Sequence, residues 1–204
     1  MEDCDLSSES LACVAICNRA NPILRRNKIN NSNGCGVLVY DSGQGLLEEN
    51  IITGNKLSGV EIRKQANPKI INNVIAKGKG SGIVIVDEGR GEILHNDIYN
   101  NASSGIKIKT GGNPIIKFNK IHHGKQRGVV VYDDGLGLIQ ENEISSFKTS
   151  TYGEQLLSEN EPQIIISIVN NAKQVEDLIM NYFNSFIQDS TILIIILFNI
   201  FIFK

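Results

Sequence analysis

Three aspartates are the first candidates for chemistry in this sequence, because they recur at a fixed spacing. Asp41, Asp87 and Asp133 are 46 residues apart, and each stands in a glycine-rich turn. A glycoside hydrolase needs two carboxylates about 5 to 9.5 Å apart, and residues two strands apart in a stacked sheet lie about 9.6 Å apart. Carboxylates in such turns commonly accept backbone N–H bonds. We therefore expect these aspartates to stabilise turns rather than to catalyse a reaction.

Histidine could supply a general base, and the chain has three: His95, His122 and His123. For a histidine to act as a base, a nucleophilic side chain would have to lie beside it. We assign no serine or cysteine to that role, because none is placed at an equivalent position of the repeating pattern described below. We expect no catalytic residue, and the chain is not expected to be an enzyme.

Four cysteines lie within the first 35 residues: Cys4, Cys13, Cys17 and Cys35. No histidine or second cysteine pair lies nearby to complete a zinc site, so we expect no metal and no cofactor.

The N-terminus is acidic and is followed by a short apolar stretch, unlike a signal peptide. We expect a reducing compartment, cytoplasmic or nuclear.

The composition indicates stacked aliphatic layers rather than an aromatic pocket. The 204 residues include 23 Asn and 32 Ile but no Trp, and aromatic residues make up 6%. The formal charge is −2; residues 154–204 carry six acids and two lysines, so residues 1–153 carry +2 (−2 minus −4). That charge gives no basic stripe, and we expect no nucleic-acid partner.

The dominant feature is a repeat of 23 residues. Asparagine recurs at this period, with isoleucine two places later: Asn27, Asn50, Asn73, Asn96, Asn119 and Asn142. Nine residues after each of the first five asparagines, a glycine begins a short alternating apolar run: Gly36, Gly59, Gly82, Gly105 and Gly128. Alternation with period two predicts strands.

A second period of 46 residues is superimposed on the first. Asn-Pro opens alternate units, and glycine takes the proline position in the units between: Pro22, Gly45, Pro68, Gly91, Pro114 and Gly137. Glycine at alternate places in these turns supplies positive φ for tight bends. The natural unit is therefore a pair of 23-residue turns.

This pattern predicts an all-β fold, a right-handed single-stranded parallel β-helix of about six 23-residue coils. Leucine-rich repeats also carry an Asn ladder, but proline or glycine here replaces their first leucine. A left-handed hexapeptide helix fails because 23 is not a multiple of six. Isoleucine and leucine at equal phase would stack inward as the core, and the six asparagines would form a structural ladder of amide hydrogen bonds.

The outward positions of the strand after each glycine are the best candidates for a binding surface. Alternate coils there are apolar and charged, which could form a ribbon for an extended peptide of a protein substrate. The candidate residues are Leu38, Tyr40, Arg63, Val84, Lys107, Lys109, Val130 and Tyr132. The alternative is that these side chains simply cover the sheet.

Four segments resemble the β-helix repeats of the F-box-only protein family: NPILRRNKI (21–29), LLEEN (46–50), IHHGKQ (121–126) and YDDGLG (132–137). The likeness covers residues 13 to 146 and includes the 46-residue double period. The resemblance implies the substrate-recognition part of a Skp1-cullin-F-box ubiquitin ligase. We expect no catalysis from it.

The sequence departs from that family in two ways, because it has neither an F-box before the repeats nor the zinc module after them. We expect a fragment, a truncated gene model or a diverged copy, with Skp1 and cullin as partners only through the missing F-box. The alternative function is a carbohydrate-binding or polysaccharide-cleaving β-helix, which should have a carboxylate cluster outside the turns.

We divide the chain into an N-terminal partial segment (1–12), the β-helix repeats (13–148) and a divergent tail (149–204). In the tail, apolar residues at helical spacing predict an amphipathic helix from about Asn171. The final apolar run, Ile192 to Phe203, would reach about 18 Å as a helix, short of the roughly 30 Å of a bilayer core. We therefore do not expect a membrane partner.

Overall fold

A computed structural model describes residues 1–145 as a β-helix built from three parallel sheets. Sheet A contains β3 (Ile23–Arg25), β6 (Leu46–Glu48), β9 (Lys69–Ile71), β12 (Glu92–Leu94), β15 (Ile115–Lys117) and β18 (Leu138–Gln140). Sheet B contains β1 (Asp5–Leu6), β4 (Lys28–Asn30), β7 (Ile51–Thr53), β10 (Val74–Ala76), β13 (Asp97–Tyr99), β16 (Lys120–His122) and β19 (Glu143–Ser145). Sheet C contains β2 (Ala12–Ile16), β5 (Cys35–Val39), β8 (Val60–Ile62), β11 (Ile83–Ile85), β14 (Ile106–Ile108) and β17 (Val129–Val131).

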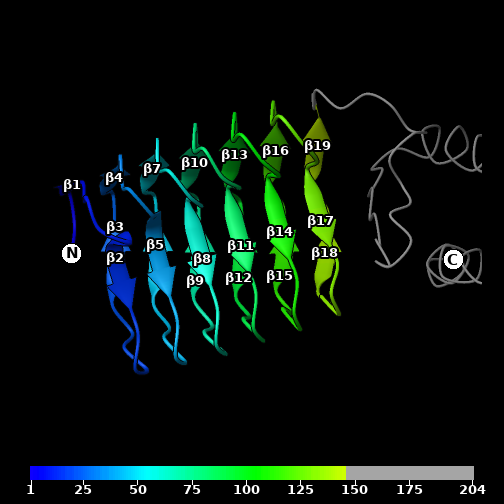
Figure 1. The fold of residues 1–204 in the computed structure, drawn as a ribbon, viewed down its shortest axis with the longest axis horizontal. Helices are drawn as coiled ribbons and strands as arrows, with labels where there is room; N and C mark the ends of the chain where they lie inside the picture. Colours follow the sequence, from blue (N-terminus) through cyan, green and yellow to red (C-terminus); the bar gives the residue numbers. More distant parts are fainter. Residues whose placement is uncertain (146–204) are drawn as a thin grey trace, which may run out of the picture. The chain divides into compact units, whose positions relative to one another are not determined.

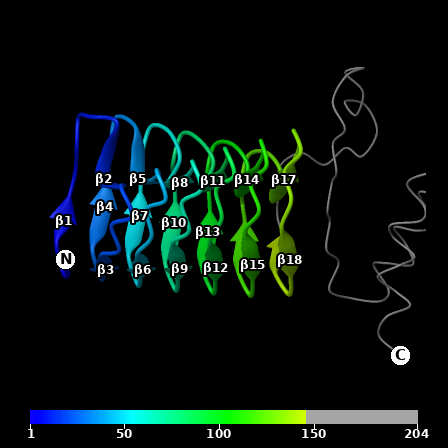
Figure 2. The ribbon, with the colours of Figure 1, turned by 90° about the horizontal axis from the view of Figure 1, so that it is seen from below.

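Each coil contributes one strand to each sheet, and the coils follow one another along the axis as repeated rungs (Figures 1 and 2). The register advances by 23 residues at every step, as in Ile52 beside Ile75 and Ile75 beside Ile98. Residues 1–145 contain no helix; accordingly, no helix there could span a membrane. The expected right-handed parallel β-helix of about six coils is confirmed.

The core is a set of aliphatic stacks along the axis. In sheets A and B the middle residue of each strand points inward, and Leu47, Ile70, Ile75 and Ile98 are fully buried. In sheet C the first and third residues do so, as with Val60 and Ile62. Each buried aliphatic side chain contributes about 1.5–3 kcal/mol. Stacking lets every coil share this contribution with its two neighbours.

Three corners close each coil, and each uses the left-handed backbone region. Between sheets A and B one residue has positive φ, such as Glu49 at 57°. The corner between sheets B and C also has one, such as Lys77 at 58°. The corner between sheets C and A has two in succession, such as Asp87 at 50° and Glu88 at 58°.

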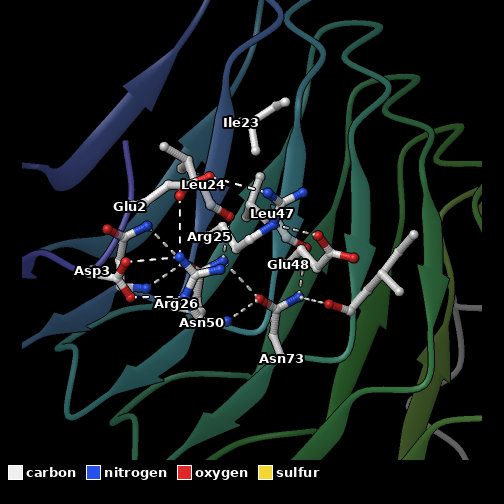
Figure 3. Close-up of polar contacts among 12 residues, drawn as sticks. Glu2, Asp3, Ile23, Leu24, Arg25, Arg26, Leu47, Glu48, Asn50 and Asn73 are labelled. Carbon is white, nitrogen blue, oxygen red and sulfur yellow. Dashed lines mark hydrogen bonds and ion pairs between the residues drawn. The ribbon is translucent and has the colours of Figure 1, made fainter.

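The asparagine ladder follows the corner between sheets A and B. Asn50 Nδ2 donates to Asn73 Oδ1 at 2.9 Å and to the carbonyl of Leu24 at 2.8 Å. The same Asn73 oxygen accepts the backbone N–H of Asn50 at 2.9 Å. Figure 3 shows Asn50 and Asn73 end to end in this arrangement. The Asn50 amide thus joins its own coil to the coils before and after it, and the ladder satisfies backbone groups that the corner leaves unpaired.

A second, discontinuous ladder of asparagine side chains lies at the corner between sheets B and C. We did not predict it, because its asparagines occur only on alternate coils. Asn55 Oδ1 accepts the backbone N–H of Ser32 at 2.9 Å, and Asn101 Oδ1 accepts that of Gly78 at 3.0 Å. Asn55 and Asn101 are 46 residues apart and both are buried. The double period therefore alternates side-chain amides with smaller residues at this corner.

Residues 1–6 are tied to the first full coil. Leu6 pairs with Ile29 in sheet B, as every later coil pairs with the next. Arg26 makes a bidentate contact with Asp3, at 2.9 and 2.8 Å, which lowers the pKa of the Asp3 carboxyl. Figure 3 shows this contact beside Arg25, whose Nε reaches Glu48 of the following coil at 2.8 Å. Strand β1 lies in the N-terminal region 1–12 that we expected to be a partial segment. It already follows the 23-residue register of the β-helix.

One column requires glycine because consecutive coils approach too closely there for a side chain. A Cβ at Gly82 would lie 2.6 Å from the carbonyl oxygen of Gly105 in the next coil. Gly36 and Gly105 meet the next glycine of the column at the same 2.6 Å. This explains the glycine nine residues after each of the first five ladder asparagines. The amphipathic helix and apolar run expected in the tail lie outside the described residues.

We predict that Asn73→Ala lowers the free energy of unfolding by about 3–5 kcal/mol, because it leaves several buried backbone and amide groups unpaired. Asn67→Ala is the matched control, since Asn67 is exposed and its side chain makes no hydrogen bond within residues 1–145. Urea denaturation of the two variants measures the difference. Equal stability of the two would contradict a structural role for the ladder.

Candidate functional site

The structure places all eight candidate residues on one strip along sheet C. Leu38, Val84, Lys107 and Val130 are the outward residues of successive or alternate strands. Tyr40, Arg63, Lys109 and Tyr132 directly follow β5, β8, β14 and β17, where the chain turns toward sheet A. Leu38 is the most covered of them, at 8% exposed. The others are partly exposed and available for contact.

A furrow of about 330 Å³ runs over this strip, across four consecutive coils. Five of the eight candidate residues line it: Arg63, Val84, Lys107, Lys109 and Tyr132. The remaining lining residues are Glu61, Val86 and Asp87. Leu38, Tyr40 and Val130 lie on the strip but do not line the furrow. We refer to these eight lining residues as the sheet C furrow.

A larger groove of about 890 Å³ follows the adjoining corner between sheets C and A. Its lining residues are the left-handed turn residues of five coils: Asn18, Arg19, Asp41, Ser42, Lys64, Gln65, Asp87, Glu88 and Thr110. Asp87 lines both hollows. The sheet C furrow therefore continues into a polar corner groove, which the sequence analysis did not assign to the site. The sequence did indicate this groove indirectly, because the predicted turns recur at one position of the 23-residue repeat and therefore stack along the axis.

Ion pairs neutralise some of the charged side chains on this surface. Arg63 Nη1 contacts Glu61 Oε1 at 3.3 Å, and Lys64 Nζ contacts Asp41 Oδ1 at 3.3 Å in the corner groove. Lys107, Lys109 and the carboxylate of Asp87 have no ion pair within residues 1–145. The sheet C furrow thus retains two unpaired cations beside one unpaired carboxylate.

The tyrosines of the strip hold cations close to their rings. Arg63 Cζ lies 5.7 Å from the Tyr40 ring centroid, and Lys109 Nζ lies 5.9 Å from that of Tyr132. Such contacts orient long cationic side chains. Hydrogen bonding with the Cys17 side chain raises the pKa of the Tyr40 hydroxyl. Both tyrosines are partly exposed.

The turn aspartates differ from expectation in their hydrogen bonding. Each turn is closed by a backbone bond, such as Gly89 N–H to the carbonyl of Val86 at 2.9 Å. Two positive φ values within the turn give it type I′ geometry. Within residues 1–145 the Asp41, Asp87 and Asp133 carboxylates accept no backbone N–H bond, because the left-handed backbone already closes the turn. The positive φ expected at alternate glycines holds at the second glycine of each turn, as at Gly45 with 117°, but is wrong for the first, as at Gly43.

A second polar cluster lies on the outer face of sheet B. His122 Nε2 is 2.8 Å from Asp97 Oδ1, and His122 Nδ1 is 2.6 Å from His123 Nδ1. The Tyr99 ring stacks on His122 with a centroid distance of 5.2 Å. The expectation that no serine matches a histidine phase is wrong, because Ser145 is the register partner of His122. Asp97 and His122 lie on neighbouring strands, but Asp97 is directly opposite Lys120, two residues before His122. Comparing residues that are 23 positions apart therefore does not pair them.

No set of three or more His, Cys, Asp or Glu side chains in residues 1–145 converges to hold a metal ion. The cysteines there are free thiols, and Cys35 is buried beneath the sheet C strip. Its sulfur lies 3.2 Å from Ser58 Oγ and 3.2 Å from Glu61 Oε2. Burial raises the pKa of the Cys35 thiol to about 11.

A comparison with family models identifies residues 12–171 as a right handed beta helix region. The chain belongs to the right-handed β-helix family. The comparison with curated proteins returned no match. The likeness therefore extends to the β-helix repeats as a class, while the narrower resemblance to the F-box-only proteins has no support from these comparisons.

One solved structure similar to this β-helix is a double mutant of the periplasmic alginate epimerase AlgG. The TM-score is 0.65 at 11% sequence identity, and the match covers 71% of this chain and 39% of that one. This shows a shared fold. It also overturns the expectation that the chain is not an enzyme, because a protein of the same fold carries out catalysis. Catalysis depends on a few side chains mounted on a fold and not on the fold itself.

We predict that stability falls between about pH 9 and pH 11 through the Cys35 thiol. The folded pKa of about 11 exceeds the ordinary value of 9.0, so this contribution is complete below pH 9 and is lost by pH 11. The loss should be of the order of 1–2 kcal/mol. Urea denaturation of the wild type and Cys35→Ala across this range measures it. An identical pH dependence in both proteins would contradict the assignment.

Proposed function

We propose that this right-handed β-helix protein binds an acidic polysaccharide along the sheet C furrow. The observation that carries the proposal is the composition of the furrow: Lys107 and Lys109 are unpaired cations, and the Tyr132 ring stands beside them. Carboxylate groups on a sugar chain would pair with the lysines. The tyrosine ring would offer an apolar face with a polar tip to a sugar ring.

The direction of the furrow suits a linear chain. It crosses four consecutive coils, from Glu61 to Tyr132, parallel to the axis of the β-helix. Rungs are about 4.8 Å apart, a spacing close to the length of one sugar unit in an extended polysaccharide. Successive sugars would therefore meet equivalent positions on successive coils. The fold shared with an alginate epimerase is compatible with this use of the surface.

A reaction on the bound sugar would use the carboxylate of Asp87. This side chain is exposed, has no ion pair within residues 1–145 and lies where the sheet C furrow meets the corner groove. A carboxylate so placed could act as a general base toward a sugar hydroxyl. Glu61 lies in the same furrow, outside the turns, but is held by Arg63. We therefore assign the base role to Asp87.

We predict that the double variant Lys107→Gln, Lys109→Gln weakens binding of polygalacturonate by about 30- to 1,000-fold, since each charge-assisted contact contributes roughly 1–2 kcal/mol and each 1.4 kcal/mol is about tenfold in affinity. The control is Lys117→Gln, Lys120→Gln, which removes the same charge from sheets A and B. Isothermal titration calorimetry with polygalacturonate and with neutral dextran measures both. Equal weakening in the two variants, or tighter binding of dextran, would overturn the proposal.

The second candidate is protein-substrate recognition of the kind implied by the resemblance to F-box-only protein 11. The favouring observation is the alternation on the strip, where apolar Leu38, Val84 and Val130 alternate with charged Glu61 and Lys107. An extended peptide could read such alternating positions along the axis. This function would place the protein in the cytosol or nucleus, as a substrate receptor for a ubiquitin ligase.

Affinity purification tests this second candidate. The chain and a version extended upstream from its own transcript are purified in parallel, and mass spectrometry asks whether Skp1 and cullin accompany them. If the chain is part of a ubiquitin-ligase substrate receptor, Skp1 and cullin should co-purify with the extended form and not with the shorter chain. Their absence from both preparations would eliminate it and leave the polysaccharide proposal unaffected.

A further inference from the structure

The cluster on the outer face of sheet B arranges two imidazoles around one point. His122 ends β16 and His123 is the left-handed corner residue that follows it, with φ at 52°. Their Nδ1 atoms are 2.6 Å apart, and the two rings meet edge to face at 83°. The backbone corner turns the second ring toward the first. Adjacent residues of a regular strand would point to opposite faces.

The contacts of His122 determine which of its nitrogens carries a lone pair. Asp97 is a carboxylate and can only accept, so His122 Nε2 donates to it across 2.8 Å. A neutral His122 then has its lone pair on Nδ1, facing His123 Nδ1. The two nitrogens share one proton in this arrangement. Moving that proton from His123 Nδ1 to His123 Nε2 leaves both Nδ1 lone pairs free, on atoms 2.6 Å apart.

The separation of these nitrogens matches metal ligands in a cis arrangement. With metal–nitrogen bonds of about 2.0–2.1 Å, two ligands at a right angle are about 2.8–3.0 Å apart, and two tetrahedral ligands about 3.3–3.4 Å apart. The observed 2.6 Å requires little opening for the first geometry and more for the second. Square-planar or tetragonal coordination is typical of Cu²⁺ and Ni²⁺, and affinity for nitrogen ligands is highest for Cu²⁺.

We propose that His122 and His123 bind a divalent transition metal, with a preference for Cu²⁺, through their two Nδ1 atoms. This site is independent of the sheet C furrow. Because no third protein ligand converges there within residues 1–145, water or an exogenous ligand completes the coordination. Lys120 lies between Asp97 and Glu143 in the register of sheet B, so one cation and two carboxylates flank the cluster.

Asp97 and Tyr99 are positioning residues for this site. The Asp97 carboxylate holds His122 in the tautomer that frees Nδ1, which is the arrangement of carboxylate, histidine and metal found in established metal sites. Tyr99 stacks on the His122 ring, whose side chain is 15% exposed. One imidazole is thus fixed before the metal arrives. His123 is exposed and supplies the adjustable ligand.

Copper titration of the full chain tests the proposal, after iodoacetamide has blocked the accessible thiols. We expect one Cu²⁺ per chain by calorimetry and an electron paramagnetic resonance spectrum split by two nitrogen nuclei. His123→Gln should weaken Cu²⁺ binding at least 100-fold. Asp97→Asn should weaken it by about 10- to 100-fold, the usual effect of losing such a carboxylate.

His95→Gln is the matched control, because His95 stacks on Phe118 at a different corner and takes no part in the cluster. This variant should bind Cu²⁺ as the wild type does. Circular dichroism of each variant establishes that the β-helix is retained. Unchanged affinity in His123→Gln, equal loss in His95→Gln, or a spectrum without nitrogen splitting would overturn the proposal.

Discussion

The fold depends on one constraint, which is that each coil must place the same kind of residue directly over its counterpart 23 residues earlier. The asparagine ladder enforces this register, because every ladder amide bonds to the amide, backbone N–H or carbonyl of a neighbouring coil. A coil shifted by one residue would put isoleucine on the surface and leave the amides unpaired. The aliphatic stacks supply most of the burial energy, and the ladder selects a single alignment.

Periodicity made the β-helix predictable from the sequence. The Asn-x-Ile unit located the corner and the inward residue, and alternation after each glycine located sheet C. The eight outward residues followed from the same alternation. All of these features depend on residues separated by whole multiples of the repeat, for which a single sequence carries a direct signal.

The remaining parts depend on relations that the period does not describe. Asp97 and His122 lie on neighbouring strands but are offset by two residues, so their contact depends on side-chain reach. The two imidazoles meet because His123 adopts the left-handed corner conformation, which is uncommon outside glycine but enriched for histidine. The turn carboxylates differed from expectation for a related reason, since type I′ geometry closes those turns without them.

Stacking constrains the inward positions and leaves the outward positions free to vary, and our proposal places function at the outward positions. A coil can exchange Leu38 for Glu61 or Lys107 on the outside while its inward residues stay aliphatic. That freedom is why one fold can serve an epimerase and other proteins. It also explains why expecting no catalysis from the repeat alone was wrong.

Lysine footprinting tests most directly the claim that a ligand lies along sheet C. The chain is acetylated with and without polygalacturonate, and mass spectrometry measures the modification of each lysine. The proposal predicts protection of Lys107 and Lys109, with unchanged modification of Lys69 and Lys117 on sheet A and of Lys28 and Lys120 on sheet B. Protection confined to sheets A or B, or equal on all faces, would contradict it.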